Sequence, residues 1–534
     1  MKQQNLFDAI PRHRLESLTR DELIEFNEAQ SKVIEQFQKH IQRLEALNAE
    51  LEQKSLFVEE QYITIKNKMF GKSSERQPKA SLASNSGAEG TNRKKILLPS
   101  ERYPEAALIE RHVTMDQILN CGCCGTEMED SGMSEDSEYL TVIPKQYIVV
   151  REMRHKYRCG KCHGDIKTAP KPPRVKPGSA YSDEMMIDVS LSKYCDLIPI
   201  ERYAKIAERE GIKGLPPQSL IETSHYLADY IKDAYHKLKT EICASPVLHA
   251  DETPHRMLEG DKKCSWYLWG FSNAESCYFE YHNTRSGDVA SHLLKESNCQ
   301  YLVSDVFSGY SKAVSDTNTS RKDIDLPLIK NIYCNAHARR KFSEACDVFL
   351  KLAESAKSAE AREGLLVEYE RAKFYVDEYA KIYKLWSDSK EHPPDGISQL
   401  KLQMQPHFEL MRDRAMSDKG GYSEKSSFGK AMRYFLNNYE GLTRFLDRGD
   451  LPIDNNPAER LLRSPVIGRK TWYGTHSKLG AKTSAILFSL VESCKLNKVN
   501  PREYIKCLVA DLHQGKSAYT PFEYKKTLES QIVV

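Results

Sequence analysis

The feature that most constrains the fold is a pair of short apolar runs that each lead into an aspartate. Val247–Ala250 precedes Asp251, and Tyr301–Ser304 precedes Asp305. Apolar runs of this length, bounded by polar residues, predict buried β-strands. We expect each strand to end at its aspartate, so that both carboxylates lie at the strand ends.

Further elements around these runs predict one sheet. Two aromatic-rich segments, 264–272 and 277–283, follow the first run and predict a two-stranded meander. A helical pattern at 288–297 and an apolar run at 332–334 come next. Strands interleaved with helices in this order predict a mixed α/β sheet.

A third acid, Glu459, lies at a predicted helix start in the run Asp454–Arg460. Two strand-end aspartates and a helical glutamate, Asp251, Asp305 and Glu459, are the ligands that a two-metal phosphoryl-transfer site requires. Mg²⁺ prefers oxygen ligands and keeps positions open for substrate phosphates, and a pair of such ions clamps the attacking and leaving oxygens. We therefore predict two Mg²⁺ ions, or Mn²⁺, at these three catalytic acids.

Two alternatives concern this third acid. If Asn456 is an N-cap, Glu459 falls at the capping-box position, and it is also spaced to pair with Arg463 on the same helix. Asp454, in the preceding turn, is the other candidate for the third metal ligand. We favour Glu459, because a carboxylate on a rigid helix holds a metal better than one on a loop.

The segment that follows the third acid contains basic residues whose charge no nearby acid in the sequence balances. The segment 461–483 contains five cations and no acid, with Trp472 and Tyr473 between them. Cations interleaved with aromatics next to a carboxylate suit a DNA strand entering the site. The residues predicted to contact DNA, here and in the run 334–342, are His337, Arg339, Arg340, Arg463, Arg469 and Lys470. For those in 334–342 the alternative is a set of ordinary surface cations at a helix start.

The N-terminal region has a heptad pattern. Between residues 23 and 69 apolar residues alternate at spacings of three and four, and Asn48 occupies an a position. A buried asparagine there favours a parallel two-stranded coiled coil in fixed register. We predict that residues 1–77 self-associate; the alternative is a long helix packed on its own protein. Residues 78–104 predict a linker.

Two C-x2-C knuckles follow, Cys121 with Cys124 and Cys159 with Cys162. Four thiolates at this spacing predict a tetrahedral structural Zn²⁺ site of the zinc-ribbon kind, although Cys123 or His163 would also serve as a ligand. A redox pair is the alternative. The segment 151–176 holds nine Lys or Arg and only two acids, which suits the phosphate backbone of DNA or, alternatively, a solvated face.

Composition excludes other classes of protein. The charged fraction is 29% and the net charge is +3. No run approaches the ~18 apolar residues of a membrane span, and residues 1–14 contain no apolar core of a signal peptide. We expect no membrane partner and a cytoplasmic location.

Several motifs together resemble the transposases of bacterial insertion-sequence family sixty-six, which are DDE enzymes with an RNase H-like core. The resemblance covers nearly the whole chain. It rests on the cysteine knuckles and on the runs Met69–Glu75, Leu248–Pro254, Cys334–Phe342, Asp454–Arg460, Gly468–Trp472 and Asn500–Tyr504.

The resemblance implies that Asp251, Asp305 and Glu459 are the catalytic triad, and that accessory proteins of the same element are partners. It also implies a bacterial cell and association with the nucleoid. Two departures are Asn335, where the family usually has an aromatic residue, and Thr471–Tyr473, which varies an asparagine-containing run. Neither departure removes a metal ligand.

The predicted fold is multidomain α/β, with an RNase H-like catalytic core that carries an all-helical insertion. The predicted parts after the coiled coil and linker are a zinc ribbon (105–166), a linker (167–182), a helix-turn-helix-like region (183–240), the core (241–337 and 451–483), the insertion (338–450) and a helical tail (484–534).

The predicted function is a DNA transposase that binds the ends of its insertion sequence, cleaves DNA strands and transfers them. Two alternatives are a DNA-binding regulator with an inactive nuclease core and an RNase H-like nuclease without strand transfer.

Overall fold

The computed structural model describes Thr19 and residues 98–104, 106–110, 123–124, 126–127, 137–143, 145–159, 161, 166–258, 265–322, 326–354, 356, 358–389, 397–422 and 426–532. The predicted coiled coil over residues 1–77, with Asn48, lies outside this part, as do Cys121 and Cys162. The chain divides into two compact units, residues 1–140 and 141–534. In the first, the short helix α3 (Pro99–Arg102) is joined to Glu138, whose carboxylate accepts from the Ser100 amide at 2.8 Å and hydroxyl at 2.9 Å.

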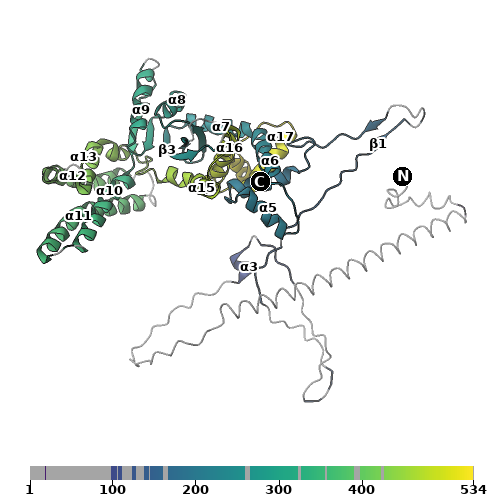
Figure 1. Cartoon of the computed structure of the whole chain (residues 1–534), viewed down its shortest axis with the longest axis horizontal. Coiled ribbons are helices and arrows are strands. Elements are labelled where there is room, and N and C mark those ends of the chain that lie inside the picture. Colours follow the sequence, from purple (N-terminus) through teal and green to yellow (C-terminus); the bar gives the residue numbers. More distant parts are fainter. Residues whose placement is uncertain are drawn as a thin grey trace. The chain divides into compact units, whose positions relative to one another are not determined.

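The second unit holds the remaining elements (Figure 1). Its strands are β1 (Lys156–Tyr157), β2 (Lys167–Thr168), β3 (Val247–Arg256), β4 (Ser265–Ser272), β5 (Cys277–His282), β6 (Tyr301–Ser304) and β7 (Lys330–Tyr333). Its helices before the insertion are α4 (Asp183–Tyr194), α5 (Ile200–Arg209), α6 (Pro217–Tyr230), α7 (Lys232–Ala244), α8 (Asp288–Lys295) and α9 (Ser308–Arg321). The later helices are α10 (Asn335–Glu354), α11 (Ala359–Ser389), α12 (Ile397–Asp418), α13 (Ser427–Asn437), α14 (Tyr439–Thr443), α15 (Asn456–Trp472), α16 (Lys478–Leu496), α17 (Pro501–His513) and α18 (Pro521–Ile532), with 3-10 turns at Lys419–Gly421 and Arg444–Asp447.

Five strands form one mixed sheet in the order β5-β4-β3-β6-β7. β3, β4 and β5 are antiparallel neighbours, which confirms the predicted meander. β6 lies parallel to β3 on one side and to β7 on the other. The predicted mixed sheet with many helices is therefore confirmed.

The expectation that Asp251 ends its strand is wrong. Asp251 is the fifth residue of the ten-residue strand β3, because β4 continues to pair with β3 from His249 to Arg256. Pairing with β6 stops at His249. Asp251 therefore lies just beyond the parallel half of the strand. Pro254, which has no amide hydrogen to donate, is tolerated there because β6 no longer pairs with β3 at this point.

The sheet separates two apolar cores, as neighbouring residues of β6 show. Leu302 belongs to a core that also contains residues of α4, α7, α9 and α16. Val303, the next residue, belongs to a second core with Phe342 and Phe408 of the helical block α10–α14. Successive side chains of a strand point to opposite faces, so the short strand β6 serves both cores.

The region between β7 and α15 is helical, as predicted. No strand occurs in the described residues between 335 and 447. The buried Asn335 joins the start of this block to its end: its side-chain amide donates to the carbonyls of Leu442 at 2.8 Å and Ile453 at 3.0 Å. Tyr379 of α11 donates to its side-chain oxygen at 3.3 Å. An asparagine replaces the family's usual aromatic residue here, and its polar contacts explain how it is accommodated.

Helix α9 was missed by the sequence analysis, although its inward face has helical spacing. Tyr310, Ala313, Val314, Thr317 and Arg321 are its buried residues besides Gly309. The polar residues between them obscured the pattern. Helices α5 and α6 do occupy the positions of the predicted helix-turn-helix, whose role in reading DNA stays a prediction.

The end of β3 is also joined to the segment that follows α15. The amide of Thr475 donates to the carbonyl of Arg256 at 3.1 Å, and Met257 forms a parallel bridge with Thr475. Gly474 has a φ of +136°, and a Cβ there would lie 2.2 Å from the Arg256 carbonyl oxygen. Only glycine allows this approach, which fixes α15 at both ends against β3. Among the described helices, none is sufficiently long and apolar to cross a bilayer.

Candidate active site

The three predicted catalytic acids come from three elements. Asp251 lies in β3, Asp305 directly follows β6, and Glu459 lies in the first turn of α15. Burial, followed by the charges of Glu252, Asp305 and Glu459, raises the pKa of Asp251 to about 8. Like charges within a few ångströms have this effect, so the structure brings the three acids together.

Each aspartate is oriented by a backbone amide. The Glu252 amide donates to Asp251 Oδ1 at 2.9 Å. The Phe307 amide donates to Asp305 Oδ1 at 3.0 Å. In each case one carboxylate oxygen is held by the backbone and the other is left for a cation.

Glu252, the neighbour of Asp251, was not singled out from the sequence. Its side chain is 2% exposed and accepts hydrogen bonds from Tyr310 Oη at 2.5 Å and Arg285 Nε at 2.8 Å. Burial raises the pKa of Glu252, although these two bonds oppose the shift. With its oxygens bound by Tyr310 and Arg285, Glu252 anchors α9 to β3 and adds negative charge beside Asp251.

Helix α15 is positioned by Asn455, and the expected N-cap at Asn456 is wrong by one residue. Asn455 does not cap the helix with its side chain. The amide instead donates to the Ala250 carbonyl at 2.9 Å and accepts from His249 Nδ1 at 2.9 Å. Glu459 consequently lies one position beyond the capping-box site, so capping does not explain it.

Asp454, the alternative third acid, is engaged in the turn before α15. Its carboxylate accepts from the backbone amide of Asn456 at 3.1 Å, from the Asn456 side chain at 2.7 Å and from Tyr383 Oη at 3.1 Å. These three bonds account for Asp454 as a structural residue that ties α15 to α11.

Two of the predicted DNA-contacting residues surround Glu459. His337 Nδ1 lies 3.6 Å from Glu459 Oε1, and Arg340 Nη2 lies 3.9 Å from Oε2. Both come from the first turns of α10. Within the described residues these are the ion-pair contacts of Glu459, and the expected pair with Arg463 is not among them.

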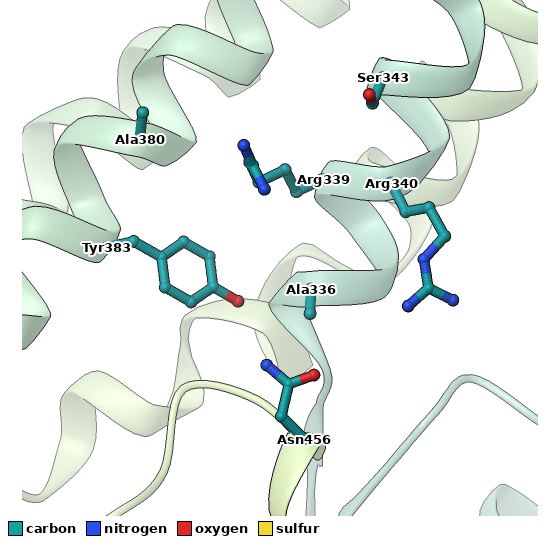
Figure 2. Close-up of a pocket in the computed structure, with 7 residues that line it drawn as sticks. All are labelled: Ala336, Arg339, Arg340, Ser343, Ala380, Tyr383 and Asn456. Atoms are coloured by element: carbon teal, nitrogen blue, oxygen red, sulfur yellow. The ribbon is translucent and has the colours of Figure 1, made fainter. Parts of the chain in front are cut away.

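A cationic pocket of about 410 Å³ opens beside this acid, between α10, α11 and the start of α15. Figure 2 shows the Arg339 guanidinium between the helix that carries Ala336 and the one that carries Tyr383. Arg340 and Asn456 also line the pocket. The pocket therefore offers positive charge and hydrogen-bond donors within one helical turn of Glu459.

The other predicted DNA-contacting residues lie farther along α15. Arg463 and Lys470 are exposed, and Arg469 is half-buried. Arg469 and Lys470 stand ten and eleven residues after Glu459, roughly 15 Å along the helix axis. Arg469 lies near His255 and, after the larger effect of burial, helps to lower the pKa of that imidazole to about 4. The structure thus does not bring these two cations to the acids.

The aromatic residues at the end of α15 differ from each other. Lys193 Nζ of α4 lies over the Trp472 ring, 4.1 Å from its centroid. The Tyr194 and Trp472 rings pack edge to face, with their centroids 6.4 Å apart. Trp472 is half-buried and packs α15 against α4. Tyr473 is 77% exposed.

The zinc ligands are only partly described. Cys124 and Cys159 are exposed, whereas Cys121 and Cys162 lie outside the described residues. Strand β1 ends two residues before Cys159 and pairs antiparallel with β2. The four-cysteine zinc site therefore stays a prediction.

The acids have the chemistry to hold divalent cations. Asp251, Asp305 and Glu459 offer hard oxygen ligands. Burial is the first cause of the raised pKa of Asp251, and the charges of Glu252, Asp305 and Glu459 add to it. A divalent cation bound among these oxygens would balance these charges, so the residues present fit the metal.

Two family models match the chain. The model of the Transposase IS66 family matches residues 178–483, which include all three acids and more than half of the chain. The model of the zinc-finger binding domain of transposase IS66 matches residues 119–163. The first model covers more than half of the chain and describes a family of DDE-type transposases; the chain therefore belongs to the IS66 transposase family.

Relatives of similar length are found in Sinorhizobium fredii (strain NBRC 101917 / NGR234). The chain is 24% identical to "Uncharacterized protein y4hP" over 81% of this chain and 78% of the relative. It is 25% identical to "Uncharacterized protein y4jD" over 84% of both. It is 26% identical to "Uncharacterized protein y4qI" over 78% of this chain and 75% of the relative.

Proposed function

We propose that the protein is a DNA transposase that binds the ends of its insertion sequence, cleaves them and joins them to target DNA. One observation carries the proposal: Asp251, Asp305 and Glu459 converge within the segment that matches the transposase family. Three carboxylates from separate elements, close enough for two of them to raise the pKa of the third, suit a cation-dependent phosphoryl-transfer site.

The proposed roles of the residues are as follows. Asp251, Asp305 and Glu459 would together hold two divalent cations, Mg²⁺ or Mn²⁺. When bound, such a pair activates the attacking hydroxyl and stabilises the leaving oxygen. Asn455 keeps α15, and with it Glu459, in register with β3 through its bond to Ala250.

The cations of α10 bind the DNA backbone next to the scissile phosphate. His337 and Arg340 adjoin Glu459, and Arg339 lines the adjacent pocket (Figure 2). Guanidinium groups suit phosphate because their fork of donors matches its oxygens. Arg463, Arg469 and Lys470, spread along α15, bind phosphates farther from the cleavage point.

The remaining parts have supporting roles. The core is RNase H-like, a proposal supported by the order β5-β4-β3-β6-β7 with β6 and β7 parallel to β3. Residues 1–77 form a parallel dimeric coiled coil, 105–166 hold one structural Zn²⁺, and 183–240 contribute to DNA reading. Residues 338–450 are an insertion, 484–534 a helical tail, and the linkers are 78–104 and 167–182. Accessory proteins of the same element complete the assembly.

The test uses the purified full-length chain, duplex DNA carrying the terminal sequences of its own element, and Mg²⁺. The proposal expects nicks at the element ends and, with a target duplex present, joined products. Cleavage without joining identifies a nuclease, and binding without cleavage identifies a regulator with an inactive core. Either outcome refutes the proposal.

A further inference from the structure

Three potential metal ligands of different chemistry meet beside α10. The Cys334 thiol, the His337 imidazole and the Glu459 carboxylate each offer an atom within 4.8 Å of the other two. Cys334 directly follows β7, His337 lies in the first turn of α10, and Glu459 lies in α15. The proposed roles of His337 toward DNA and of Glu459 toward the cleavage cations do not explain why these three atoms lie close together.

Two of the three atoms have no hydrogen-bond partner among the described residues. His337 Nδ1 and Glu459 Oε1 are buried from solvent, and neither forms a hydrogen bond with any described residue. They face each other at 3.6 Å, which is too long for a hydrogen bond. Buried polar atoms without partners are costly, and a cation between these two would satisfy both. Ligand atoms around a tetrahedral zinc ion stand about 3.5 Å apart, close to the separation seen here.

The third atom is prepared to carry negative charge. Cys334 Sγ accepts a hydrogen bond from the Asn455 backbone N–H at 3.2 Å, and a second one from the His337 backbone N–H. Without a metal, burial raises the pKa of this thiol to about 12, although these two bonds oppose the rise. Metal binding displaces the proton from a thiol, and the two amides then stabilise the thiolate.

The donor set selects the metal. Mg²⁺ prefers an all-oxygen environment, whereas a thiolate, an imidazole and a carboxylate together suit Zn²⁺, with water in the fourth position. We propose that Cys334, His337 and Glu459 form a site for Zn²⁺, and that zinc bound there withholds Glu459 from the cleavage cations. The second half of this inference rests on the proposed function, whereas the first half does not.

One group opposes the site and must move. Arg340 Nη2 lies 3.9 Å from the other oxygen of Glu459, and its side chain is 54% exposed. An exposed arginine rotates into solvent at small cost, because exposed ion pairs contribute little to stability. Zinc and Arg340 therefore compete for Glu459.

The experiment measures zinc bound to the full-length chain after equilibration with zinc and removal of the excess, using a chromophoric chelator. Cys334→Ser is the test variant, because serine can still accept hydrogen bonds from the backbone N–H groups of Asn455 and His337. Cys346→Ser is the control, since Cys346 is a buried thiol of α10 outside the cluster. The inference expects one zinc ion fewer in Cys334→Ser than in wild type, and no loss in the control.

A second readout concerns inhibition. In DNA cleavage with Mg²⁺, zinc inhibits wild type. Loss of an outer-sphere contact weakens metal binding by up to roughly 100-fold. Because Cys334 is a direct ligand, the zinc concentration that inhibits Cys334→Ser should be at least roughly 100-fold higher. Equal zinc content in wild type and Cys334→Ser overturns the inference even if the chain cleaves DNA. Conversely, a chain that loses one zinc with Cys334→Ser but never cleaves DNA refutes the proposed function and leaves the zinc site standing.

Discussion

The Asn455 side chain donates to the Ala250 carbonyl at 2.9 Å, directly before Asp251. A single side-chain amide therefore joins the strand that carries one proposed catalytic acid to the helix that carries another. Asn455 is 1% exposed, and its side-chain oxygen also accepts from His249. We expect Asn455 to help set the separation of Asp251 and Glu459.

Asn455→Ala should therefore impair cleavage beyond its effect on stability. Removing two buried hydrogen bonds costs about 2 kcal/mol, and displacement of the third acid by about 1 Å costs about 10²-fold in rate. The measurements are melting temperature and end cleavage per folded molecule. The matched control is Asn497→Ala, because Asn497 is 4% exposed and its amide donates to two carbonyls far from the site. Equal loss of cleavage in both variants would contradict the positioning role.

Glu459→Gln and Asp454→Asn separate the two candidates for the third acid. Glu459→Gln should lower cleavage by about 10³-fold or more, because bound metal contributes several kcal/mol to phosphoryl transfer. Its melting temperature should hardly change, since no hydrogen bond of Glu459 is lost. Asp454→Asn should keep most of its cleavage activity, because Asp454 serves Asn456 and Tyr383. The reverse pattern would assign the metal to Asp454.

The raised pKa of Asp251 predicts a pH dependence of stability in the metal-free protein. Its folded-state pKa of about 8 lies above the ordinary value of 3.8, so the folded state binds this proton more tightly than the unfolded state. Stability should therefore fall as the pH rises from about 4 to 8. Asp251→Asn should remove this part of the slope and raise stability at pH 8 by about 2 kcal/mol. Urea unfolding at several pH values, with and without Mg²⁺, checks this. A slope unchanged by the substitution would show that Asp251 ionises normally.

Asp188 on α4 should give the opposite pH dependence of stability. Burial would raise the pKa of Asp188, but hydrogen bonds from Lys145, Tyr203 and Arg502 outweigh it and lower the pKa. Its stabilisation is therefore present above the ordinary pKa and is lost as the pH falls toward the folded-state value. Asp188→Asn should cost about 1–2 kcal/mol at pH 7, because it weakens hydrogen bonds to charged groups whose cationic side chains are partly exposed to solvent.

Asp229→Asn is the control for this effect. Asp229 is 66% exposed and pairs with Lys232 on the surface, where an ion pair contributes about 0–1 kcal/mol. Thermal unfolding at pH 7 of both variants gives the comparison. Equal melting temperatures would show that the contacts of Asp188 add nothing to stability.

Cys159→Ser should release the zinc of the ribbon and leave the catalytic core folded. Metal analysis should find one zinc ion fewer than in wild type, because a structural site needs all four ligands. The melting transition of the core should persist, since residues 119–163, which match the zinc-finger model, lie outside the segment that matches the transposase model. Unchanged zinc content would point to other ligands, such as Cys123 or His163.

Local patterns predicted the sheet but not where its strands end. The apolar runs before Asp251 and Asp305 are visible in the sequence because strand residues that face a core must be apolar. The extension of β3 to Arg256 is not visible, because it depends on pairing with β4, which polar residues such as Thr253 also sustain. The α9 helix was missed for a similar reason: its buried face includes Thr317 and Arg321, which are polar.

The acids were predictable, and their supports were not. Asp251, Asp305 and Glu459 follow recognisable local patterns and family motifs. Asn455 looks like an ordinary capping residue, and only the position of β3 more than 200 residues away reveals its bond to Ala250. Glu252 likewise looks like a second acid of an acidic pair until Tyr310 and Arg285 are brought against it.

The bond between Asn335 and Ile453 spans 118 residues of chain, and this has a consequence for synthesis on the ribosome. At about 5–20 residues per second, Asp251 and Asp305 exist for on the order of ten seconds before Glu459 is made. During that interval the nascent chain has two acids and no third, so the proposed cleavage site is incomplete until translation passes α15. A product truncated within α10–α14 would likewise lack the third acid of the proposed site.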